Sequence, residues 1–304
     1  MKTLNYIEDI EQMDNLQSLV DEFGAILVYD MPNEVYHMTK PFISASRLKK
    51  IKKSTAHFLT PDKSERKKHF DIGHAFELYL VEPSTFHESV AIFREDERPE
   101  LEKTFASTKN KQWKENFYTV NESKYIISYE DFQMILEMTK NCKNDPFIKE
   151  MLDKAKLQPS IFYKTENSVY FKTRPDIVSF TKCGERMNII DIKTALDGSP
   201  QGFAKASANL DYPVQCGTQI MGVEKFFGKQ VENYFYLVAE KESPYNATMY
   251  YVDDTDKGQF VDLCHNLLDK AKTAIETKQK RGYSENADNP QGVLKLNIPV
   301  WYWH

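Results

Sequence analysis

The chain has 304 residues, of which 41% are hydrophobic and 13% aromatic, and this composition is sufficient to bury a core. Its formal net charge of −5 excludes a surface that is basic throughout, but it allows a locally basic groove that binds nucleic acid. The first residues are acidic and no apolar run approaches the roughly 18 residues of a membrane span, so we expect a cytoplasmic protein without membrane contact.

The cysteines and the absence of repeats limit the domain organisation. Cys142, Cys183, Cys216 and Cys264 are widely separated and form none of the close pairs that zinc or iron–sulfur ligation usually shows. We therefore expect reduced cysteines and no iron–sulfur cluster. No internal repeat and no long Gly, Ser or Pro linker divides the sequence, which predicts one domain over residues 1–304.

Two helices are predicted in the first third of the chain. ISASRLKKIKKSTAHFL (43–59) begins with serines suited to N-capping and continues with apolar residues at helical spacing. FDIGHAFELYLVEP (70–83) places Glu77 beside apolar residues on one side of a second helix. The stretch from about 93 to 128 is rich in charge and has no steady period, so it predicts a long charged loop.

Helices are also predicted over 129–143 and 146–155, before the chain changes to strand-like sequence in SIFYKT, SVYFKTRPDIVSF and RMNIIDIKT. One or two helices follow within 200–227, then the strands VENYFYLVAE and ATMYYVD, and a terminal helix from about 254 to 280. Strands flanked by helices on this pattern predict an α/β fold with a central mixed sheet.

A hairpin in the middle of the chain brings acidic residues together. TKCGE (181–185) is a suitable turn, and a turn centred there pairs Asp176 with Asp191 across the two strands. The strand period of two then places Lys193 on the same face as Asp191. Pro175 cannot donate a ladder hydrogen bond, so it favours a bulge or a strand end near Asp176.

Two facing carboxylates destabilise a sheet unless a positive charge neutralises them. Oxygen ligands without nitrogen or sulfur donors suit Mg²⁺, or Mn²⁺ as a substitute, and both metals bind substrate phosphate. The alternative is that each aspartate pairs with Arg174 or Lys193 on a solvated face. The combination of Asp176, Asp191 and Lys193 at one place favours the metal site.

Two helices supply further candidates. Glu77 enters an apolar face, where an ionised carboxylate needs a metal or a lysine as its partner, and His74 at i−3 is a further candidate ligand. In DYPVQCGTQIMG (211–222) Gln215 lies on the polar side of a helix. That side is either simply exposed, or it brings Gln215 to the site to orient Lys193 or the attacking water.

With these residues the sequence resembles the PD-(D/E)XK nucleases, and more closely the exonuclease VIII (RecE-type) recombination exonucleases of phages and prophages. RPD is followed by DIK fifteen residues after its aspartate, as in that signature. The segments that match in order are PFISASRLKKIKKSTAHFL, FDIGHAFELYLVEPSTF, KTRPDIVSF, NIIDIKTA and FAKASANLDYPVQCGTQIMG. The resemblance covers about residues 35 to 230, which leaves about 1–35 as an N-terminal extension, and it implies a restriction-endonuclease-like core.

The resemblance implies roles for the matching residues. Asp176 and Asp191 are implied as metal ligands, Ile192 as a ligand through its backbone carbonyl, Lys193 as the catalytic lysine, and Gln215 as the glutamine that follows the active-site strands.

Two positions depart from the family pattern. The exonuclease VIII branch carries a histidine where Glu77 aligns, and glutamate is common there in the wider superfamily. Gln219 stands where related nucleases often have the tyrosine of a Gln-x-x-x-Tyr motif. With Glu77 as the helical ligand, the implied cofactor is Mg²⁺, for which Mn²⁺ can substitute.

The implied activity is Mg²⁺-dependent exonucleolytic degradation of one strand of linear double-stranded DNA, 5′→3′, which exposes single strand for recombination in a bacterial or phage-infected cell. The implied partners are double-stranded DNA ends, a ring of identical subunits such as a tetramer, and a single-strand annealing protein. The aromatic tail IPVWYWH (298–304) docks either on a neighbour or, more simply, on its own domain.

Basic residues near these motifs are candidate phosphate contacts, and the alternative for each is a solvated helix face. The candidates lie in RLKKIKK (47–53), SERKKHF (64–70), KNKQWK (109–114) and the RPD motif: Arg47, Lys49, Lys50, Lys53, Lys111 and Arg174.

Two other activities fit the same residues. The first is a structure-specific or nicking DNA endonuclease of the same fold, because the motif does not distinguish a terminal from an interior phosphodiester. The second is a non-catalytic DNA-binding module on a decayed nuclease scaffold, against which the joint presence of Glu77, Asp176, Asp191, Lys193 and Gln215 argues.

Overall fold

The computed structural model describes residues 1–61, 68–153, 156–287 and 291–298. Most of the basic segment 64–70 and nearly all of the aromatic tail 298–304 therefore lie outside the described residues. Within the described ranges, no helix is long and apolar enough to cross a membrane. The thiols of Cys142, Cys183, Cys216 and Cys264 are free, and Cys183 is the exposed one.

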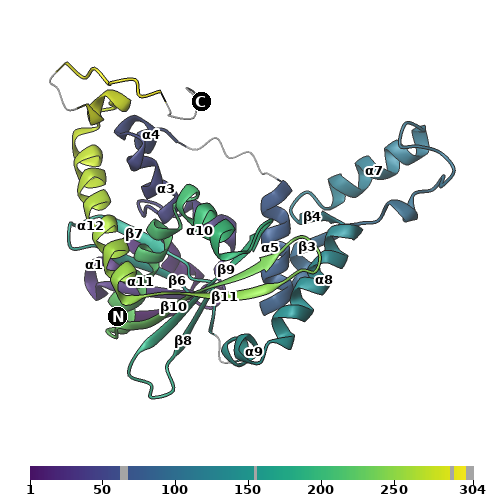
Figure 1. The fold of residues 1–304 in the computed structure, drawn as a ribbon, viewed down its shortest axis with the longest axis horizontal. Helices are drawn as coiled ribbons and strands as arrows, with labels where there is room; N and C mark the ends of the chain where they lie inside the picture. Colours follow the sequence, from purple (N-terminus) through teal and green to yellow (C-terminus); the bar gives the residue numbers. More distant parts are fainter. Residues whose placement is uncertain (62–67, 154–155, 288–290, 299–304) are drawn as a thin grey trace.

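A five-stranded mixed sheet forms the centre of the molecule (Figure 1). β9 and β10 are parallel, and the other neighbours are antiparallel. The two parallel strands are connected by the helices α10 (Pro200–Asn209) and α11 (Tyr212–Phe227), as a parallel crossover requires. The α/β class expected from the sequence is confirmed. In spatial order the strands are β11 (Ala247–Val252), β10 (Val231–Glu240), β9 (Met187–Ala195), β8 (Ile177–Phe180) and β5 (Lys156–Leu157).

Helices cover both faces of this sheet because its strands alternate two apolar faces. Ile189 of β9 packs toward Val214 of α11, whereas Ile190 packs toward Phe76 of α5 (Lys68–Val81). The long helix α12 (Asp254–Thr277) lies against α11, and α8 (Tyr129–Asn144) lies against α5. On β9, side chains at odd-numbered positions therefore face α11, and those at even-numbered positions face α5.

The N-terminal extension expected over about 1–35 contributes two strands to a second, four-stranded sheet. Its order is β1 (Lys2–Asn5), β2 (Ala25–Tyr29), β6 (Ser160–Lys164) and β7 (Tyr170–Thr173). Ile26 and Val28 of β2 are fully buried in a cluster with Phe162 of β6. The remaining elements are η1 (Ile10–Asn15), α1 (Leu16–Phe23), α2 (Asn33–Met38), α3 (Ala45–Lys49), η2 (Lys50–Lys52), α4 (Thr55–Leu59), α6 (Phe86–Ser89), α9 (Pro146–Asp153) and η4 (Tyr283–Asn286).

The prediction of a long charged loop over about 93–128 is wrong. This region forms an arm that projects from the body (Figure 1), between the paired strands β3 (Val90–Phe93) and β4 (Tyr125–Ser128). It contains the short helix η3 (Glu95–Glu97) and the helix α7 (Thr108–Val120). The rings of Trp113 and Phe117 pack on Phe93, with centroids 5.2 and 5.1 Å away. The arm therefore has a small aromatic core of its own.

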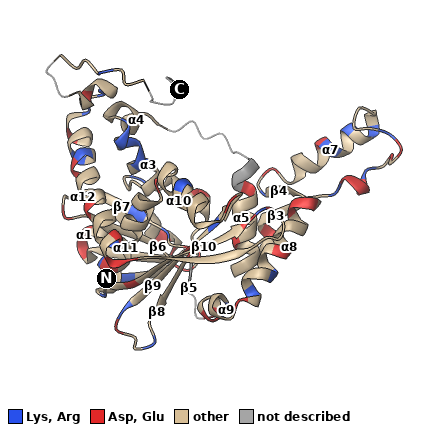
Figure 2. Cartoon of the chain, in the orientation of Figure 1, with Lys and Arg blue, Asp and Glu red and all other residues tan. Residues whose placement is uncertain are grey.

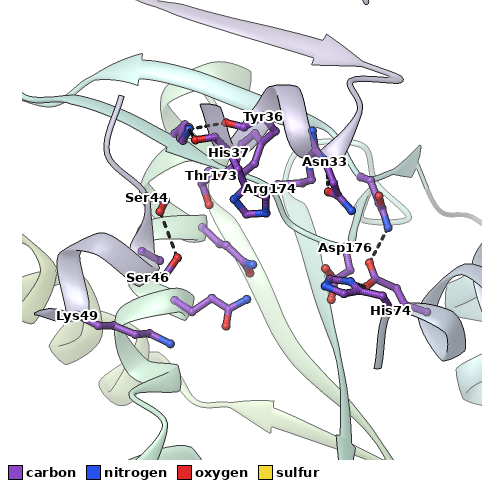
Figure 3. A pocket seen from close by; sticks show the side chains of 16 residues that line it. Asn33, Tyr36, His37, Ser44, Ser46, Lys49, His74, Thr173, Arg174 and Asp176 are labelled. Atoms are coloured by element: carbon purple, nitrogen blue, oxygen red, sulfur yellow. Dashed lines mark hydrogen bonds and ion pairs between the residues drawn. The ribbon is translucent and has the colours of Figure 1, made fainter. Parts of the chain in front are cut away.

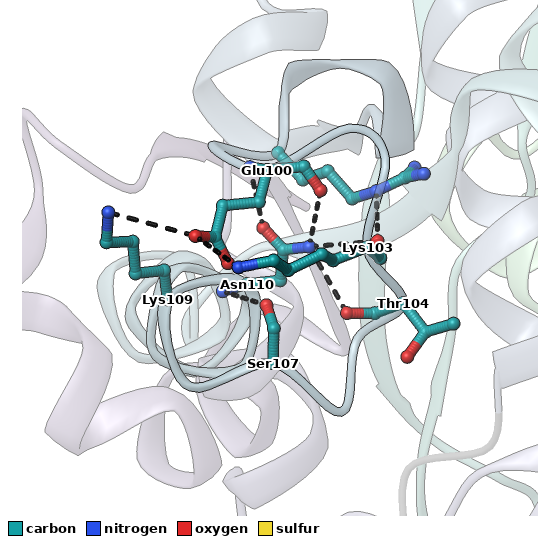
Figure 4. Close-up of polar contacts among 7 residues, drawn as sticks. Glu100, Lys103, Thr104, Ser107, Lys109 and Asn110 are labelled. Atoms are coloured by element: carbon teal, nitrogen blue, oxygen red, sulfur yellow. Dashed lines mark hydrogen bonds and ion pairs between the residues drawn. The ribbon is translucent and has the colours of Figure 1, made fainter.

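Asn110 fixes the loop of this arm onto α7 (Figure 4). Its buried side chain accepts a hydrogen bond from the backbone N–H of Glu100 and donates to the backbone carbonyls of Glu100, Lys103 and Thr104. One asparagine thus links the loop to α7 through four hydrogen bonds to backbone groups. The arm carries both signs of charge (Figure 2), with Lys109, Lys111 and Lys114 on α7 and the acidic residues of η3 before it.

Candidate active site

The predicted hairpin register is confirmed along β8. Ile177 pairs with Ile190 and Phe180 with Met187, as a turn over 181–185 requires. The ladder ends before Asp176, next to Pro175. The backbone carbonyl of Asp176 accepts from the N–H of Gln158, and its Oδ2 accepts from the N–H of Ile192 at 2.6 Å. The carboxylate of Asp176 is therefore positioned by the backbone of β9 and not by ladder pairing with Asp191.

Asp191 lies on the α11 side of β9 and is completely buried. Its Oδ1 accepts hydrogen bonds from Nε2 of Gln215 at 2.8 Å and from Nε2 of Gln219 at 3.0 Å. Its Oδ2 forms an ion pair with Nζ of Lys193, and among the described residues it has no other partner. The structure thus brings Asp191, Lys193 and Gln215 together, as the sequence predicts.

The environment of Lys193 keeps its side chain charged. Burial opposes the charge, but the carboxylates of Asp191 and Asp176 outweigh burial and raise the pKa of Lys193 above its ordinary value. The ammonium also lies 5.0 Å from the centroid of the Tyr212 ring. Lys193 is therefore a fixed positive charge beside the two aspartates.

Glu77 and His74 reach the same site from α5. Oε1 of Glu77 accepts a hydrogen bond of 2.6 Å from Nε2 of Gln158, and its Oε2 lies 3.8 Å from Nδ1 of His74. The His74 ring stacks on Tyr125 with centroids 5.1 Å apart. Burial, followed by the charges of Glu77 and Asp191, raises the pKa of Asp176 well above its ordinary value. The carboxylates of Glu77, Asp176 and Asp191 are therefore close enough for their negative charges to oppose the ionisation of Asp176.

These groups lie at a cavity of about 260 Å³ (Figure 3). His74 and Asp176 line one side, and Lys49 lies on the opposite side. Glu77 also lines the cavity, next to His74. Asp191 is covered by Gln215 and Gln219, which line the cavity and donate to it. Asp176 and Glu77 therefore line the cavity directly, whereas Asp191 is buried behind Gln215 and Gln219.

The candidate DNA contacts separate into those at the cavity and those elsewhere. Arg174 lines the cavity, but each of its three nitrogens donates to a protein atom, namely Oγ of Ser160, Oδ1 of Asn33 and the carbonyl of Met31. Its guanidinium also lies 4.3 Å from the ring centroid of Tyr36. The contacts of Arg174 support a role in holding β7 and the α2 region together at the rim of the cavity.

Lys49 is the candidate with the clearest access to the cavity. Its Nζ donates to the carbonyl of Leu210 at 2.9 Å and lies 5.7 Å from the Tyr212 ring centroid. Burial, followed by the charge of Lys193, lowers the pKa of Lys49 to about 8, although Asp191 and Asp211 act in the opposite direction. Lys49 and Lys193 thus lie near the same aromatic ring.

Arg47, Lys50, Lys53 and Lys111 lie away from the carboxylates. Arg47 donates to the carbonyl of Thr60 and lies over the Phe58 ring. Lys50 and Lys53 line a separate hollow of about 300 Å³. Lys111 is on the projecting arm and pairs with Glu115. Contact with DNA by these four residues remains a prediction.

Sequence patterns did not indicate two further participants in the site. Gln158, the partner of Glu77, lies in a short connection without a motif. Tyr234 on β10 donates from its hydroxyl to Oε1 of Gln219 at 2.6 Å. The alternation of VENYFYLVAE places Tyr234 and Tyr236 on one face, but it gives no reason to distinguish them.

The donors fit a hard divalent cation. No three His, Cys, Asp or Glu side chains within the described ranges converge closely enough to form a ready-made metal site. Glu77, Asp176 and Asp191 nevertheless offer carboxylate oxygens alone. Burial, followed by the charges of Glu77 and Asp191, raises the pKa of Asp176, and a bound cation would offset both effects. The Ile192 carbonyl and His74 remain predicted additional ligands. Mg²⁺ or Mn²⁺ suits such oxygen donors better than a softer metal.

The fold is restriction-endonuclease-like and belongs to the PD-(D/E)XK class. Its marks are the mixed sheet, Asp176 directly before β8, and Asp191 and Lys193 on β9. The chain belongs to the family described as "PDDEXK-like domain of unknown function (DUF3799)", whose model matches residues 44–291. No curated protein matches the chain.

One solved structure supports the fold. The chain is similar to the crystal structure of a "Putative exonuclease" from Eubacterium rectale, with a TM-score of 0.54 and 13% identity over 90% of this chain and 98% of that one. It also matches the crystal structure of SSO0001, with a TM-score of 0.29 and 12% identity over 74% of this chain and 97% of that one. The likeness to the putative exonuclease is evidence for the fold alone, and the likeness to SSO0001 is too low to support the fold.

Proposed function

We propose that the protein is a Mg²⁺-dependent exodeoxyribonuclease that degrades one strand of linear double-stranded DNA, with 5′→3′ direction. The observation that carries the proposal is the buried Lys193–Asp191 ion pair, which lies behind the Gln215 and Gln219 side chains of a cavity that Asp176 and Glu77 also line. Carboxylates around a fixed lysine are the groups that phosphodiester hydrolysis needs, since charge develops on the phosphate in the transition state.

The roles of the residues follow from their positions. Glu77, Asp176 and Asp191 would hold Mg²⁺, which supplies Lewis-acid polarisation of the phosphate and a more acidic bound water. Lys193 stabilises the negative charge that develops on the phosphate oxygens, because the neighbouring aspartates keep its ammonium protonated. Lys49, across the cavity from the carboxylates, attracts the incoming phosphodiester.

The test uses purified protein with linear duplex labelled at the 5′ end, closed circular duplex and single-stranded DNA, each with and without Mg²⁺. We expect release of the 5′ label from linear duplex only with Mg²⁺, and no cutting of circles. The Asp176→Asn variant serves as the inactive control. Cutting of closed circles would replace this proposal with an endonuclease, and DNA binding without cleavage would replace it with a non-catalytic module.

The RecE-type branch, the subunit ring and the annealing partner are further parts of this proposal, and they rest on the sequence resemblance. Sedimentation of the purified protein with and without linear duplex tests the ring. We expect one discrete species larger than the monomer, and a monomer under both conditions would contradict it. Stimulation of strand annealing in a mixture with a phage-type annealing protein tests the partner.

A further inference from the structure

A chain of buried hydrogen bonds runs from β10 through α11 to the active-site aspartate. The hydroxyl of Tyr234 donates to Oε1 of Gln219 at 2.6 Å, and Nε2 of Gln219 donates to Oδ1 of Asp191 at 3.0 Å. Tyr234 and Asp191 are completely buried, and Gln219 is 1% exposed. Solvent therefore cannot replace either hydrogen bond.

The direction of this chain is determined by the charge at its end. An ionised aspartate can only accept hydrogen bonds, so Gln219 must present its NH₂ group to Asp191 and its amide oxygen to Tyr234. Tyr234 must then act as the donor. Burial raises the pKa of the Tyr234 hydroxyl well above its ordinary value, which keeps that proton in place.

These hydrogen bonds also determine which partner each carboxylate oxygen of Asp191 has. Gln215 and Gln219 both donate to Oδ1, which leaves Oδ2 for Lys193. If the Gln219 amide turned over, its oxygen would face Oδ1 and repel the carboxylate. The carboxylate would then rotate away from the orientation in which it meets Lys193.

We propose that Tyr234 is a positioning residue of the active site, which acts through Gln219 to fix the orientation of the Asp191 carboxylate. This inference rests on the proposed function, because it concerns the reaction that Asp191 and Lys193 support. It gives a role to Gln219, and it places a tyrosine hydroxyl in the site from β10 although the chain has no tyrosine four residues after Gln215.

The first experiment compares Tyr234→Phe with Tyr163→Phe. Tyr163 is a matched control, because its buried hydroxyl donates at 3.4 Å to the carbonyl of Thr218 on the same helix, outside the chain to Asp191. Both variants are checked for folding by their Tm and circular dichroism. In Tyr234→Phe the amide oxygen of Gln219 loses its donor, so we expect kcat with Mg²⁺ to fall about threefold to tenfold, with KM for linear duplex unchanged.

Tyr163→Phe is expected to keep wild-type kcat, even if its Tm falls by as much as that of Tyr234→Phe. Wild-type kcat in Tyr234→Phe would overturn the inference, as would an equal loss of kcat in Tyr163→Phe. A double-mutant cycle then tests the route of the effect. In the Gln219→Ala background Tyr234→Phe should cause no further loss of kcat, and independent, additive losses would overturn the inference.

Mn²⁺ binding, measured by the electron paramagnetic resonance of the free ion, gives a readout that is independent of cleavage. We expect Tyr234→Phe to bind Mn²⁺ about threefold to tenfold more weakly than the wild-type chain and Tyr163→Phe to bind it equally well. If the wild-type chain binds Mn²⁺ but cleaves no DNA, the proposed function fails, and the Mn²⁺ affinities alone decide this inference. A wild-type chain that neither cleaves DNA nor binds Mn²⁺ overturns both.

Discussion

The backbone N–H of Ile192 donates a 2.6 Å hydrogen bond to the side chain of Asp176. Asp176 follows Pro175 just before β8 begins, so its carboxylate completes the hydrogen bonding of β9 where the neighbouring strand ends. One carboxylate oxygen thus has a structural role and the other remains available at the cavity. This division of work makes the two functions of the residue separable by substitution.

Asp176→Asn should abolish cleavage and leave the fold intact, because an amide oxygen can still accept from Ile192. Asp176→Ala removes the acceptor and leaves a buried N–H without a partner, which costs about 1–3 kcal/mol. Urea unfolding should therefore show the Asn variant within about 1 kcal/mol of the wild-type chain and the Ala variant clearly below it. Equal stability of the two variants would mean that the Ile192 hydrogen bond contributes little.

The buried pair of Lys193 and Asp191 is expected to respond differently to single and double substitutions. Lys193→Ala leaves the Asp191 carboxylate buried without its counter-charge, and such a loss costs about 3–5 kcal/mol. The double variant Asp191→Asn with Lys193→Met removes both charges and should regain most of that stability, while remaining inactive. Thermal and urea unfolding measure both changes. A double variant less stable than Lys193→Ala would contradict a charge-based explanation.

Lys49 should give DNA binding a pH dependence near neutrality. Burial and the charge of Lys193 lower the pKa of Lys49 to about 8. Its ammonium is therefore charged below pH 8 and is lost as the pH rises through that value, so KM for DNA should increase between about pH 7 and 9. Lys49→Arg stays charged over this range and should remove the increase. A KM that rises equally in both proteins would assign the titration to another group.

Two glycines in helices should respond in opposite ways to alanine. A Cβ on Gly217 of α11 would lie 2.5 Å from the carbonyl oxygen of Phe260 and 2.7 Å from Sγ of Cys264 on α12. Gly217→Ala should therefore push the helices apart and cost about 1–3 kcal/mol. A Cβ on Gly73 of α5 would meet only Oγ1 of Thr194, at an ordinary 3.8 Å, so Gly73→Ala should stabilise the protein by up to about 1 kcal/mol. Calorimetry of both variants checks the contrast.

Asn110→Ala should loosen the projecting arm without affecting the sheets. The substitution removes the hydrogen bonds to the backbone of Glu100, Lys103 and Thr104 together. Hydrogen exchange of the amides between about 95 and 120 should become faster, whereas that of β9 and β10 should be unchanged. Faster exchange in β9 would show that the arm and the central sheet unfold as one unit.

Local patterns were sufficient to predict the central hairpin and the residues near it. A turn over 181–185 and the strand period of two determine the register, which places Asp191 and Lys193 on one face. Pro175 correctly indicated an irregular pairing near Asp176. The helical spacing of the segment around Glu77 also held, since α5 spans Lys68–Val81. These features depend on neighbours in the sequence or on one strand partner.

The features that the sequence did not predict depend on distant contacts. In α7 the aromatic residues Trp113 and Phe117 lie among charged ones, and their main partner, Phe93, is outside the helix. The single helix predicted over 43–59 is divided into α3, η2 and α4, because Ser54 caps α4 by accepting from the N–H of His57. The roles of Gln158 and Tyr234 likewise require the assembled fold.

The N-terminal strands have a consequence for the choice of a minimal fragment. The family model begins at residue 44, but β2 pairs with β6 from Ala25 to Val28, and Ile26 and Val28 are buried in one cluster with Phe162. A truncated protein that starts at residue 44 would leave an unprotected strand edge and an apolar surface open to solvent. Such a fragment would tend to aggregate, so the practical boundary for expression lies ahead of β1.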